Sequence, residues 1–181
     1  MIKTTTIIQN CFTIELDAKK DKRGLFVKTL SKTNYSSIDF PKFDVEEEYY
    51  SISKKDVIRG LHFQTPPFDH DKIVFCPKGR ILDVIIDLRK GSKSFLKHIE
   101  IELSEKTNKL IFIPKGCAHG FYSFEDDSIL VYKVSSEYSV ENDKGINWNS
   151  FKINWPAPFL EYIISERDKN LPFYKDFNNP F

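Results

Sequence analysis

The sequence predicts an all-β fold, a sandwich or barrel of short strands. Phenylalanine and tyrosine are abundant, with 16 and 8 residues, and aromatic and β-branched side chains favour strands. Apolar residues alternate with polar ones over short runs, and turn-forming residues separate these runs. No stretch has the apolar period of a long amphipathic helix. Short strands divided by frequent turns are typical of β-sandwiches and β-barrels.

Several segments have the pattern of a strand. His98–Leu103 reads H-I-E-I-E-L, which places one face toward a core and the other toward water. Turn signals such as Asp21–Gly24 and Pro77–Gly79 separate the strands. Short peripheral helices are expected near Thr33–Ile38 and after Ser165. The predicted strands are Phe12–Leu16, Phe26–Thr29, Glu46–Ser53, Ile73–Cys76, Ile81–Asp87, Lys97–Leu103, Lys109–Ile113, Gly120–Phe124 and Ile129–Val134.

Length and composition indicate one globular domain over residues 1–181, since no repeat, low-complexity tract or linker divides the chain. The net charge of +1 gives no support for a nucleic-acid partner. The first residues, MIKTTTIIQN, lack the apolar stretch of a signal peptide, and no apolar run has the ~20 residues of a membrane span. The cysteines Cys11, Cys76 and Cys117 fit neither a disulfide framework nor a zinc site. We therefore expect a cytoplasmic protein that binds neither nucleic acid nor membrane.

One predicted strand carries an acidic residue inside an apolar run. Ile81–Leu88 reads I-L-D-V-I-I-D-L, and alternation places Asp83 and Asp87 on one side while the other side is wholly apolar. Burying a carboxylate is costly unless it is paired or used. Asp83 is therefore expected to face a polar cavity, such as the interior of a ligand-binding barrel.

Polar residues from different predicted segments converge on one cavity if their strands form a small barrel. Taken singly, each of them is more often a structural residue. Together they form an acid–base set, because a histidine accepts a proton near neutral pH, a tyrosine donates one and a buried lysine stabilises an oxyanion. This set suits proton abstraction next to a carbonyl in a phosphate-bearing substrate. Its members are His62, Lys72, Asp83, His119 and Tyr132.

A metal site is the other hypothesis for the histidines. Pro114–His119 has the P-x-G-x-x-H spacing of the second cupin motif, so the chain resembles a cupin there. Metal-binding cupins also supply an H-x-H pair, but the corresponding place reads His62-Phe63-Gln64, and an amide is a poor replacement for an imidazole ligand. Because a metal site would lack ligands, we expect no metal and no other cofactor.

A series of longer motifs runs through the chain in a fixed order. They are D-K-R-G-L-F (Asp21–Phe26), R-G-L-H-F-Q (Arg59–Gln64), D-V-I-I-D-L-R-K-G-S (Asp83–Ser92), I-P-K-G-C-A-H-G-F (Ile113–Phe121), V-Y-K (Val131–Lys133), G-I-N-W-N (Gly145–Asn149), I-N-W-P (Ile153–Pro156) and S-E-R-D (Ser165–Asp168). In order and spacing, over nearly the whole chain, they resemble the dTDP-4-dehydrorhamnose 3,5-epimerase family. The resemblance implies a cupin-like jelly roll, or double-stranded β-helix, that forms a homodimer without metal. It also implies an epimerase that inverts C3, C5 or both in a nucleotide-linked 4-keto sugar through an enolate, in the biosynthesis of a cell-surface deoxysugar or heptose.

The resemblance also implies roles for individual residues. The catalytic base falls on His62, oriented by the carboxylate of Asp168. The acid falls on Tyr132, and the lysine that stabilises the enolate falls on Lys72. The matching ligand-binding positions are Arg59, His119, the base-stacking Tyr138, and Arg23 and Phe26, which the partner subunit lends. We further expect Gln64 and Asp83 to face the substrate, with Asp83 holding Lys72 or a tyrosine in place.

The chain departs from the family pattern where the nucleotide binds. Glu47–Ser51 replaces the usual Q-x-N-x-S, so Glu47 and Tyr49 stand at the base-reading positions. Lys28 replaces a glutamate, and Arg167 replaces the lysine of S-x-K-D. These four residues are still expected to contact the nucleotide and its phosphates, but the identity of the base is open.

Glu47 matches guanine better than thymine, because a carboxylate accepts from the adjacent N1–H and N2–H₂ donors that thymine lacks. This favours GDP over CDP or dTDP. The alternative is that Glu47 points to solvent and the base is held only by stacking on Tyr138. At the level of function, the rivals are a ketoisomerase on the same barrel and a non-catalytic cupin that binds nucleotide sugars.

Overall fold

Strands dominate the structure, a computed structural model that describes residues 1–156 and 162–181. Each predicted strand overlaps an observed one, and both predicted helices are present as short helices. The strands are β1 (Ile2–Thr5), β2 (Phe12–Glu15), β3 (Ala18–Asp21), β4 (Gly24–Val27), β5 (Glu47–Ser53), β6 (Ile58–Gln64), β7 (Lys72–Lys78), β8 (Arg80–Asp87), β9 (His98–Ser104), β10 (Lys109–Ile113), β11 (Cys117–Ser123), β12 (Ser128–Val134) and β13 (Asp143–Gly145). The helices are α1 (Lys32–Ser36), α2 (Glu166–Lys169) and the 3₁₀ turn η2 (Tyr174–Asp176).

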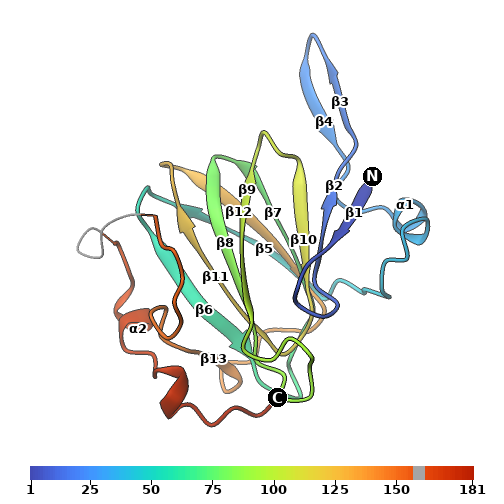
Figure 1. Cartoon of the computed structure of the whole chain (residues 1–181). Helices are drawn as coiled ribbons and strands as arrows, with labels where there is room; N and C mark the ends of the chain where they lie inside the picture. Colours follow the sequence, from blue (N-terminus) through green and yellow to red (C-terminus); the bar gives the residue numbers. More distant parts are fainter. Residues whose placement is uncertain (157–161) are drawn as a thin grey trace.

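Two antiparallel sheets face each other and form a jelly roll (Figure 1). The six-stranded sheet has the order β1-β2-β10-β7-β12-β5, and the five-stranded sheet has the order β13-β6-β11-β8-β9. A separate two-stranded hairpin is formed by β3 and β4. The prediction of an all-β, cupin-like jelly roll is confirmed.

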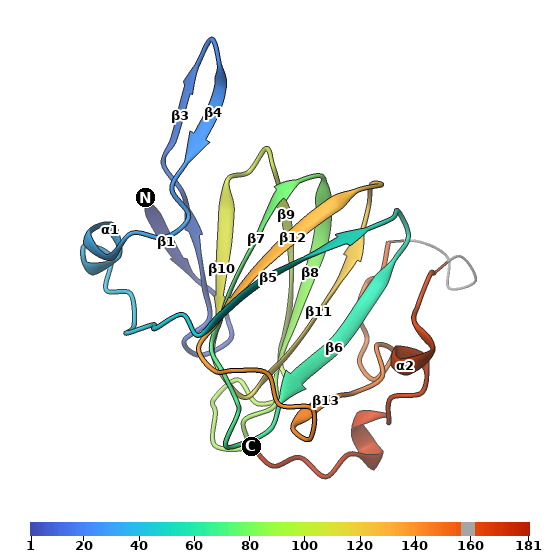
Figure 2. The same ribbon diagram turned by 180° about the vertical axis from the view of Figure 1, so that it is seen from behind.

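The apolar alternation of the strands gives each sheet an inner and an outer face. In β8, Ile81 and Ile85 pack in the core between the sheets, whereas Val84 and Ile86 pack outside, against the C-terminal tail and its Phe181. The segment around α1 packs in the same way against outward side chains of β2, β7 and β10, and the view from behind shows α1 beside β1 (Figure 2). Among the described residues, no helix has the length and apolar character needed to cross a membrane.

A close approach between β6 and β11 sets the position of two histidines. Gly60 has φ +125°, and a Cβ there would lie 2.6 Å from the Cα of Gly120. The strands therefore need glycine at residue 60. In this register His62 lies directly opposite His119, so both imidazoles extend from the same face of the sheet, toward the other sheet.

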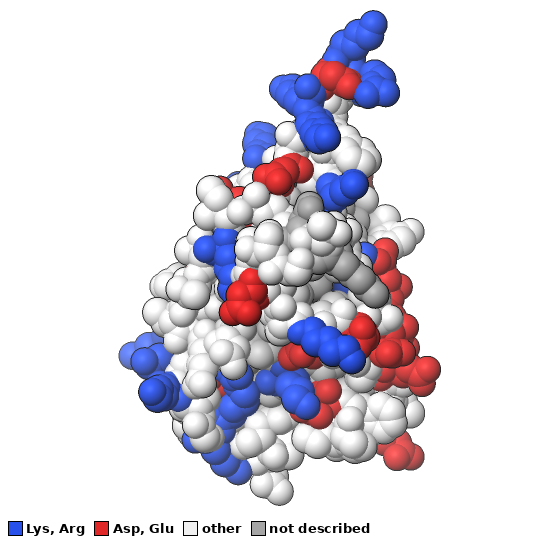
Figure 3. Space-filling model, turned by 90° about the vertical axis from the view of Figure 1, so that its right-hand side faces the viewer, with Lys and Arg blue, Asp and Glu red and all other residues white. Residues whose placement is uncertain are grey.

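The β3–β4 hairpin projects from the body of the molecule (Figure 1). Leu25 and Phe26 on it are 52% and 59% exposed, and lysine and arginine side chains crowd its tip (Figure 3). Lys19 is paired with Phe26 and Lys20 with Leu25, so each face of the hairpin carries a lysine beside a large apolar side chain.

Candidate active site

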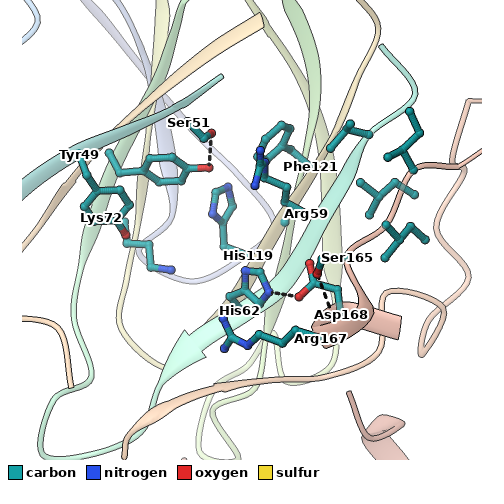
Figure 4. Close-up of a pocket in the computed structure, with 16 residues that line it drawn as sticks. Tyr49, Ser51, Arg59, His62, Lys72, His119, Phe121, Ser165, Arg167 and Asp168 are labelled. Carbon is teal, nitrogen blue, oxygen red and sulfur yellow. Dashed lines mark hydrogen bonds and ion pairs between the residues drawn. The ribbon is translucent and has the colours of Figure 1, made fainter. Parts of the chain in front are cut away.

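A cavity of about 510 Å³ lies between the two sheets. Strands β5, β6, β7, β11 and β12 and helix α2 all contribute to its walls. The structure thus brings together side chains that are far apart in the sequence (Figure 4). The predicted site residues that line it are Tyr49, Arg59, His62, Lys72, His119, Tyr132, Arg167 and Asp168.

His62 and Asp168 form a hydrogen-bonded pair on one wall of the cavity. His62 Nε2 lies 2.7 Å from Asp168 Oδ1, and the Gly60 amide donates to Asp168 Oδ2 at 3.1 Å. The side chain of Asp168 is buried, while that of His62 is 30% exposed. Burial by itself raises the pKa of Asp168, but the hydrogen bond and charge of His62, with the Gly60 amide and Arg167, lower this pKa below its usual value. Asp168 is therefore ionised and fixes the orientation of the imidazole.

Helix α2 places Asp168 at this point. The hydroxyl of Ser165 caps the helix by accepting from the Asp168 amide at 3.1 Å. The carboxylate of Asp168 then extends from the first turn of the helix toward β6.

His119 forms a second buried pair, with Asp83. The Nε2 atom of His119 lies 2.7 Å from Asp83 Oδ1, and neither side chain is more than 4% exposed. This corrects two expectations, that Asp83 holds Lys72 or a tyrosine and that it faces the substrate. Asp83 is on β8, next to β11 in the five-stranded sheet, whereas Lys72 is on the facing sheet. Asp83 therefore pairs with a residue of its own sheet. His119 lines the cavity, whereas Asp83 does not.

Lys72 is a buried cation in the wall of the cavity. Its residue is 7% exposed, and no carboxylate of the described residues lies within ion-pair distance of its Nζ. Burial lowers the pKa of Lys72 to about 8, although the charges of Asp143 and Asp83 oppose the shift. A lysine in this state carries its charge at neutral pH with little solvent to screen it.

Tyr132 extends from β12, on the opposite sheet from His62. It lies directly across from Tyr49 on β5, and the two rings stack with centroids 4.9 Å apart. The Tyr132 hydroxyl is 3.5 Å from Ser51 Oγ. Burial raises the pKa of Tyr132 far above its ordinary value, so the phenol keeps its proton at neutral pH.

Arg59 lines the same cavity from β6. Its guanidinium donates to Ser53 Oγ at 3.1 Å and to the Ile52 carbonyl at 3.2 Å. These bonds connect the two sheets at the edge strand β5, and they fix the guanidinium at the wall of the cavity.

A smaller cavity of about 330 Å³ adjoins the first and shares Tyr49, His62 and Lys72 with it. Tyr138 and Glu47 both line it, and Glu47 Oε1 accepts from the Tyr138 amide at 2.9 Å. We expected Glu47 either to read the base or to point to solvent. In the structure, one of its carboxylate oxygens instead accepts a hydrogen bond from the main chain of Tyr138.

Asp143 lies in this smaller cavity and was not identified from the sequence. Its Oδ2 accepts from the Tyr138 hydroxyl at 3.2 Å and pairs with Arg167 at 2.8 Å. Asp143 therefore joins the side chains of Tyr138 and Arg167, two residues predicted to contact the nucleotide. The only signal in the sequence is its place just before the G-I-N-W-N motif.

Gln64 lines the smaller cavity, but its amide binds the chain itself. Its Nε2 donates to the carbonyls of Phe68 and Glu137, each at 3.0 Å. Its Oε1 accepts from the Ser139 amide at 2.6 Å. Gln64 is 5% exposed, so the prediction of a direct substrate contact is corrected to a residue that holds the segment around Tyr138.

The comparison with known families is decisive. Residues 5–176 match the family model described as dTDP-4-dehydrorhamnose 3,5-epimerase. The chain belongs to this family. It is 34% identical over 168 residues to the dTDP-4-dehydrorhamnose 3,5-epimerase of Escherichia coli K12, covering 92% of this chain and 90% of that protein. The resemblance seen in the motifs is confirmed, and the chain is an isomerase-class enzyme that epimerises nucleotide-linked sugars.

Solved structures of the family agree in fold. The dTDP-4-dehydrorhamnose 3,5-epimerase of Elizabethkingia anophelis has a TM-score of 0.91 and 31% identity, covering 99% of this chain and 98% of that chain. A Legionella pneumophila dTDP-6-deoxy-D-glucose-3,5-epimerase, solved with dTDP-4-keto-L-rhamnose, has a TM-score of 0.91 and 27% identity, covering 98% and 94%.

The family residues on the hairpin are not brought to the cavity of their own chain. Arg23 is exposed and pairs with Asp21 at 2.6 Å. Phe26 and Lys28 line a separate shallow hollow with Met1. None of these three residues lines the cavity between the sheets.

The described residues contain no group of three or more His, Cys, Asp or Glu side chains that would hold a metal ion. The cysteines are buried, and burial raises the pKa of Cys11 to about 12. The cavity presents the His62 imidazole from one sheet and the Lys72 ammonium and Tyr132 phenol from the other. As arranged in Figure 4, Lys72 and Tyr49 lie on one side, Asp168 and Arg167 on the other, and His62 between them.

Proposed function

We propose that the chain inverts C3, C5 or both of a dTDP-linked 4-keto sugar, using His62 as the base and Tyr132 as the acid. The 4-keto group acidifies the hydrogens on its neighbouring carbons. His62 removes one of them, and the ionised Asp168 stabilises the imidazolium that results. The Lys72 ammonium stabilises the negative charge that develops on the enolate oxygen.

The observation that carries this proposal is the placement of base and acid on facing sheets. His62 extends from β6 in one sheet and Tyr132 from β12 in the other, and both line the same cavity. A sugar ring held between them loses a proton on one face and receives one on the opposite face. Return of the proton to the opposite face is what inverts the carbon.

Solvent isotope exchange tests the proposal. In D₂O, the wild-type enzyme should place deuterium at C3, C5 or both of a dTDP-4-keto sugar, measured by proton NMR and mass spectrometry. His62→Asn serves as the matched inactive control for exchange catalysed by the buffer. Exchange no faster with wild type than with this control would refute the assignment of His62 as the base.

The same spectra separate the rival functions. An epimerase leaves the carbonyl at C4 and inverts a neighbouring centre, whereas a ketoisomerase moves the carbonyl. A non-catalytic binding protein leaves the substrate unchanged. We propose that the sugar is a deoxyhexose for a cell-surface polysaccharide. The alternative of a heptose and the cytoplasmic location remain predictions from the sequence.

We propose dTDP rather than GDP as the nucleotide, on two observations. A bidentate pair with guanine needs both oxygens of a carboxylate turned toward the base, but Glu47 Oε1 accepts from the Tyr138 amide, which orients the carboxylate toward the main chain. Among the relatives, the Legionella enzyme was solved with a dTDP sugar, and a Bacillus anthracis enzyme, 32% identical, was solved with TDP and PPi.

Calorimetric titration of dTDP, GDP, CDP and UDP tests the nucleotide. We expect dTDP to bind most tightly, and Glu47→Ala to weaken all four nucleotides alike, because it removes the acceptor of the Tyr138 amide. Glu47→Gln keeps an acceptor oxygen and should change the affinities little. If GDP binds most tightly and Glu47→Gln removes only that advantage, the guanine hypothesis is correct.

We further propose a homodimer in which the hairpin of one subunit completes the cavity of the other. The β3 and β4 strands pair only with each other among the described residues, and a two-stranded hairpin is marginally stable alone. Strand β5 is the edge of its sheet and borders the cavity. Addition of a partner's hairpin at this edge would cover both open edges and bring Arg23 and Phe26 toward the substrate.

Mixing two inactive variants tests whether the sites are shared. Arg23→Ala lacks the lent arginine, and His62→Asn lacks the base, so each parent should be weak. Subunit exchange should restore part of the activity, because some cavities then combine an intact His62 with an intact Arg23. A mixture no more active than its parents would show that each site is built from one chain.

A further inference from the structure

His70 lies in the wall of the smaller cavity and has no role in the proposed reaction. Its Nδ1 is 3.0 Å from Ser136 Oγ and 3.2 Å from Gln64 Nε2. Ser136 Oγ is in turn 2.7 Å from the Phe68 carbonyl, which also accepts from Gln64. His70 is therefore one member of a polar network rather than an isolated imidazole.

This network joins the chain segment before Lys72 to the segment that carries Tyr138. Gln64 binds the Glu137 carbonyl and the Ser139 amide, the groups on either side of Tyr138. Ser136 lies two residues before Tyr138, and His70 is its imidazole partner. The position of the Tyr138 main chain is thus set from the side opposite to Glu47.

The hydrogen inventory assigns a protonation state to His70. The two amide hydrogens of Gln64 are used by the carbonyls of Phe68 and Glu137, and the hydroxyl hydrogen of Ser136 goes to Phe68. Ser136 Oγ then accepts from His70 Nδ1–H, which leaves Nε2 without a proton. Nε2 is buried and has no hydrogen-bond partner among the described residues, so a second proton there would be buried without an acceptor.

The neighbouring charge favours the same neutral form. Burial and the charge of Lys72 together lower the pKa of His70 to about 3. A neutral imidazole adds no second positive charge next to the lysine that faces the substrate.

We propose that His70 is a positioning residue that, as a neutral imidazole, fixes Ser136 and so preorganises Tyr138 for the nucleotide. The inference rests on the proposed function, in which the base stacks on Tyr138. Its consequence is a division of effects: loss of the network weakens nucleotide binding, while the groups that move protons are untouched.

Two substitutions at residue 70 test the proposal, with dTDP affinity measured by calorimetry and kcat and KM measured with the dTDP-4-keto sugar. His70→Leu removes the donor to Ser136 and should raise Kd and KM by about tenfold, with kcat within about twofold. His70→Asn keeps an N–H donor at the place of Nδ1 and should recover most of the affinity. His98→Leu is the matched control, since His98 is a partly exposed histidine on β9, and it should leave Kd unchanged.

A double-mutant cycle tests whether the effect passes through Ser136. Ser136→Ala should reproduce the His70→Leu effect, and the double variant should be no weaker than either single one. Additive losses, or a fall in kcat and thermal stability without rescue by His70→Asn, would reduce His70 to a structural residue.

The outcomes also separate this inference from the proposed function. Wild type that binds no nucleotide would overturn the proposed function and this inference together. Wild type that binds dTDP, with His70→Leu binding it equally well, would overturn only the role of His70.

Discussion

Burial favours the neutral form of each ionisable residue of the site, and the residues differ in whether partners oppose it. It lowers the pKa of Lys72 and raises that of Tyr132, which in each case favours the neutral form. Asp168 is also buried, but hydrogen bonds and nearby positive charge keep it ionised. One cavity therefore holds an ionised carboxylate, a protonated phenol and a lysine that titrates near the physiological range.

Substitution of the base and of the acid should have different effects. His62→Asn should lower exchange and inversion by at least about 100-fold, the usual contribution of a positioned general base. Tyr132→Phe should block inversion more than exchange, because abstraction does not require the acid. Deuterium exchange and product formation, measured side by side, check this, and equal loss of both in Tyr132→Phe would assign the tyrosine to abstraction as well.

Lys72 should give the reaction an upper pH limit. Its charge is lost as pH rises through about 8, so kcat/KM, which reports the free enzyme, should fall above that pH. Lys72→Met should lower kcat by about 10²–10³-fold, as removal of an oxyanion donor does, and should abolish this limb. A limb that persists in Lys72→Met would belong to another group.

The same lysine should affect stability and activity in opposite directions as pH rises: its contribution to stability increases, whereas activity falls. Its folded pKa of about 8 is below the ordinary value of 10.5, so the unfolded chain binds more protons between these values. The Lys72 contribution to the free energy of unfolding therefore rises with pH over this window. Lys72→Met should be more stable than wild type at pH 7, and urea denaturation should show that this difference narrows by pH 10.

Motifs identified the reactive residues better than their partners. His62 and Tyr132 lie in quoted motifs, Lys72 was identified through the family resemblance, and all three line one cavity. The partner of Asp83 was not predictable, because it depends on which strand lies beside β8. Gln64 was misassigned for a similar reason: alternation gives the direction of a side chain but not the main-chain groups that will meet it.

At the scale of elements, regular alternation was the reliable signal. β9 alternates strictly, β8 is an apolar run with Asp83 and Asp87 on one side, and both were located from the sequence, whereas β6 was not assigned as a strand. Arg59, Gly60 and His62 interrupt its apolar pattern because the strand forms a wall of the cavity. β1 and β3 are short and mostly polar, and their strand state comes from pairing that the local sequence does not specify.

The contact between β6 and β11 predicts the effect of a glycine substitution. Gly60→Ala places a Cβ 2.6 Å from the Gly120 Cα at φ +125°, so it should cost about 1–3 kcal/mol or more in the free energy of unfolding. Gly91→Ala is the control, since nothing lies within 4 Å of its Cβ, and it should change stability by less than about 1 kcal/mol. Equal effects in urea denaturation would mean that the strands separate easily at this point.

On the scale of the whole molecule, an exposed apolar surface offers a face for the proposed homodimer. Phe75, Val131 and Tyr50 are register neighbours across the outer face of the six-stranded sheet, and Tyr50 is 66% exposed. Ile52 on the same edge strand is 52% exposed. A row of this kind, next to an open sheet edge, is a surface that a second subunit would cover.

If the proposed dimer forms through this face, a charge placed there should break it. Analytical ultracentrifugation of the wild type should give a mass of twice 21.2 kDa. Tyr50→Asp should shift the equilibrium toward the monomer, because a carboxylate at a buried interface is costly to desolvate. Phe173→Asp is the control, since Phe173 is an exposed aromatic in the C-terminal tail, 43% accessible, and it should stay dimeric. If Arg23 is lent between subunits, activity should fall with the dimer fraction on dilution of Tyr50→Asp. Full activity in a monomer would contradict the shared site, and a monomeric wild type would remove the homodimer from the proposal.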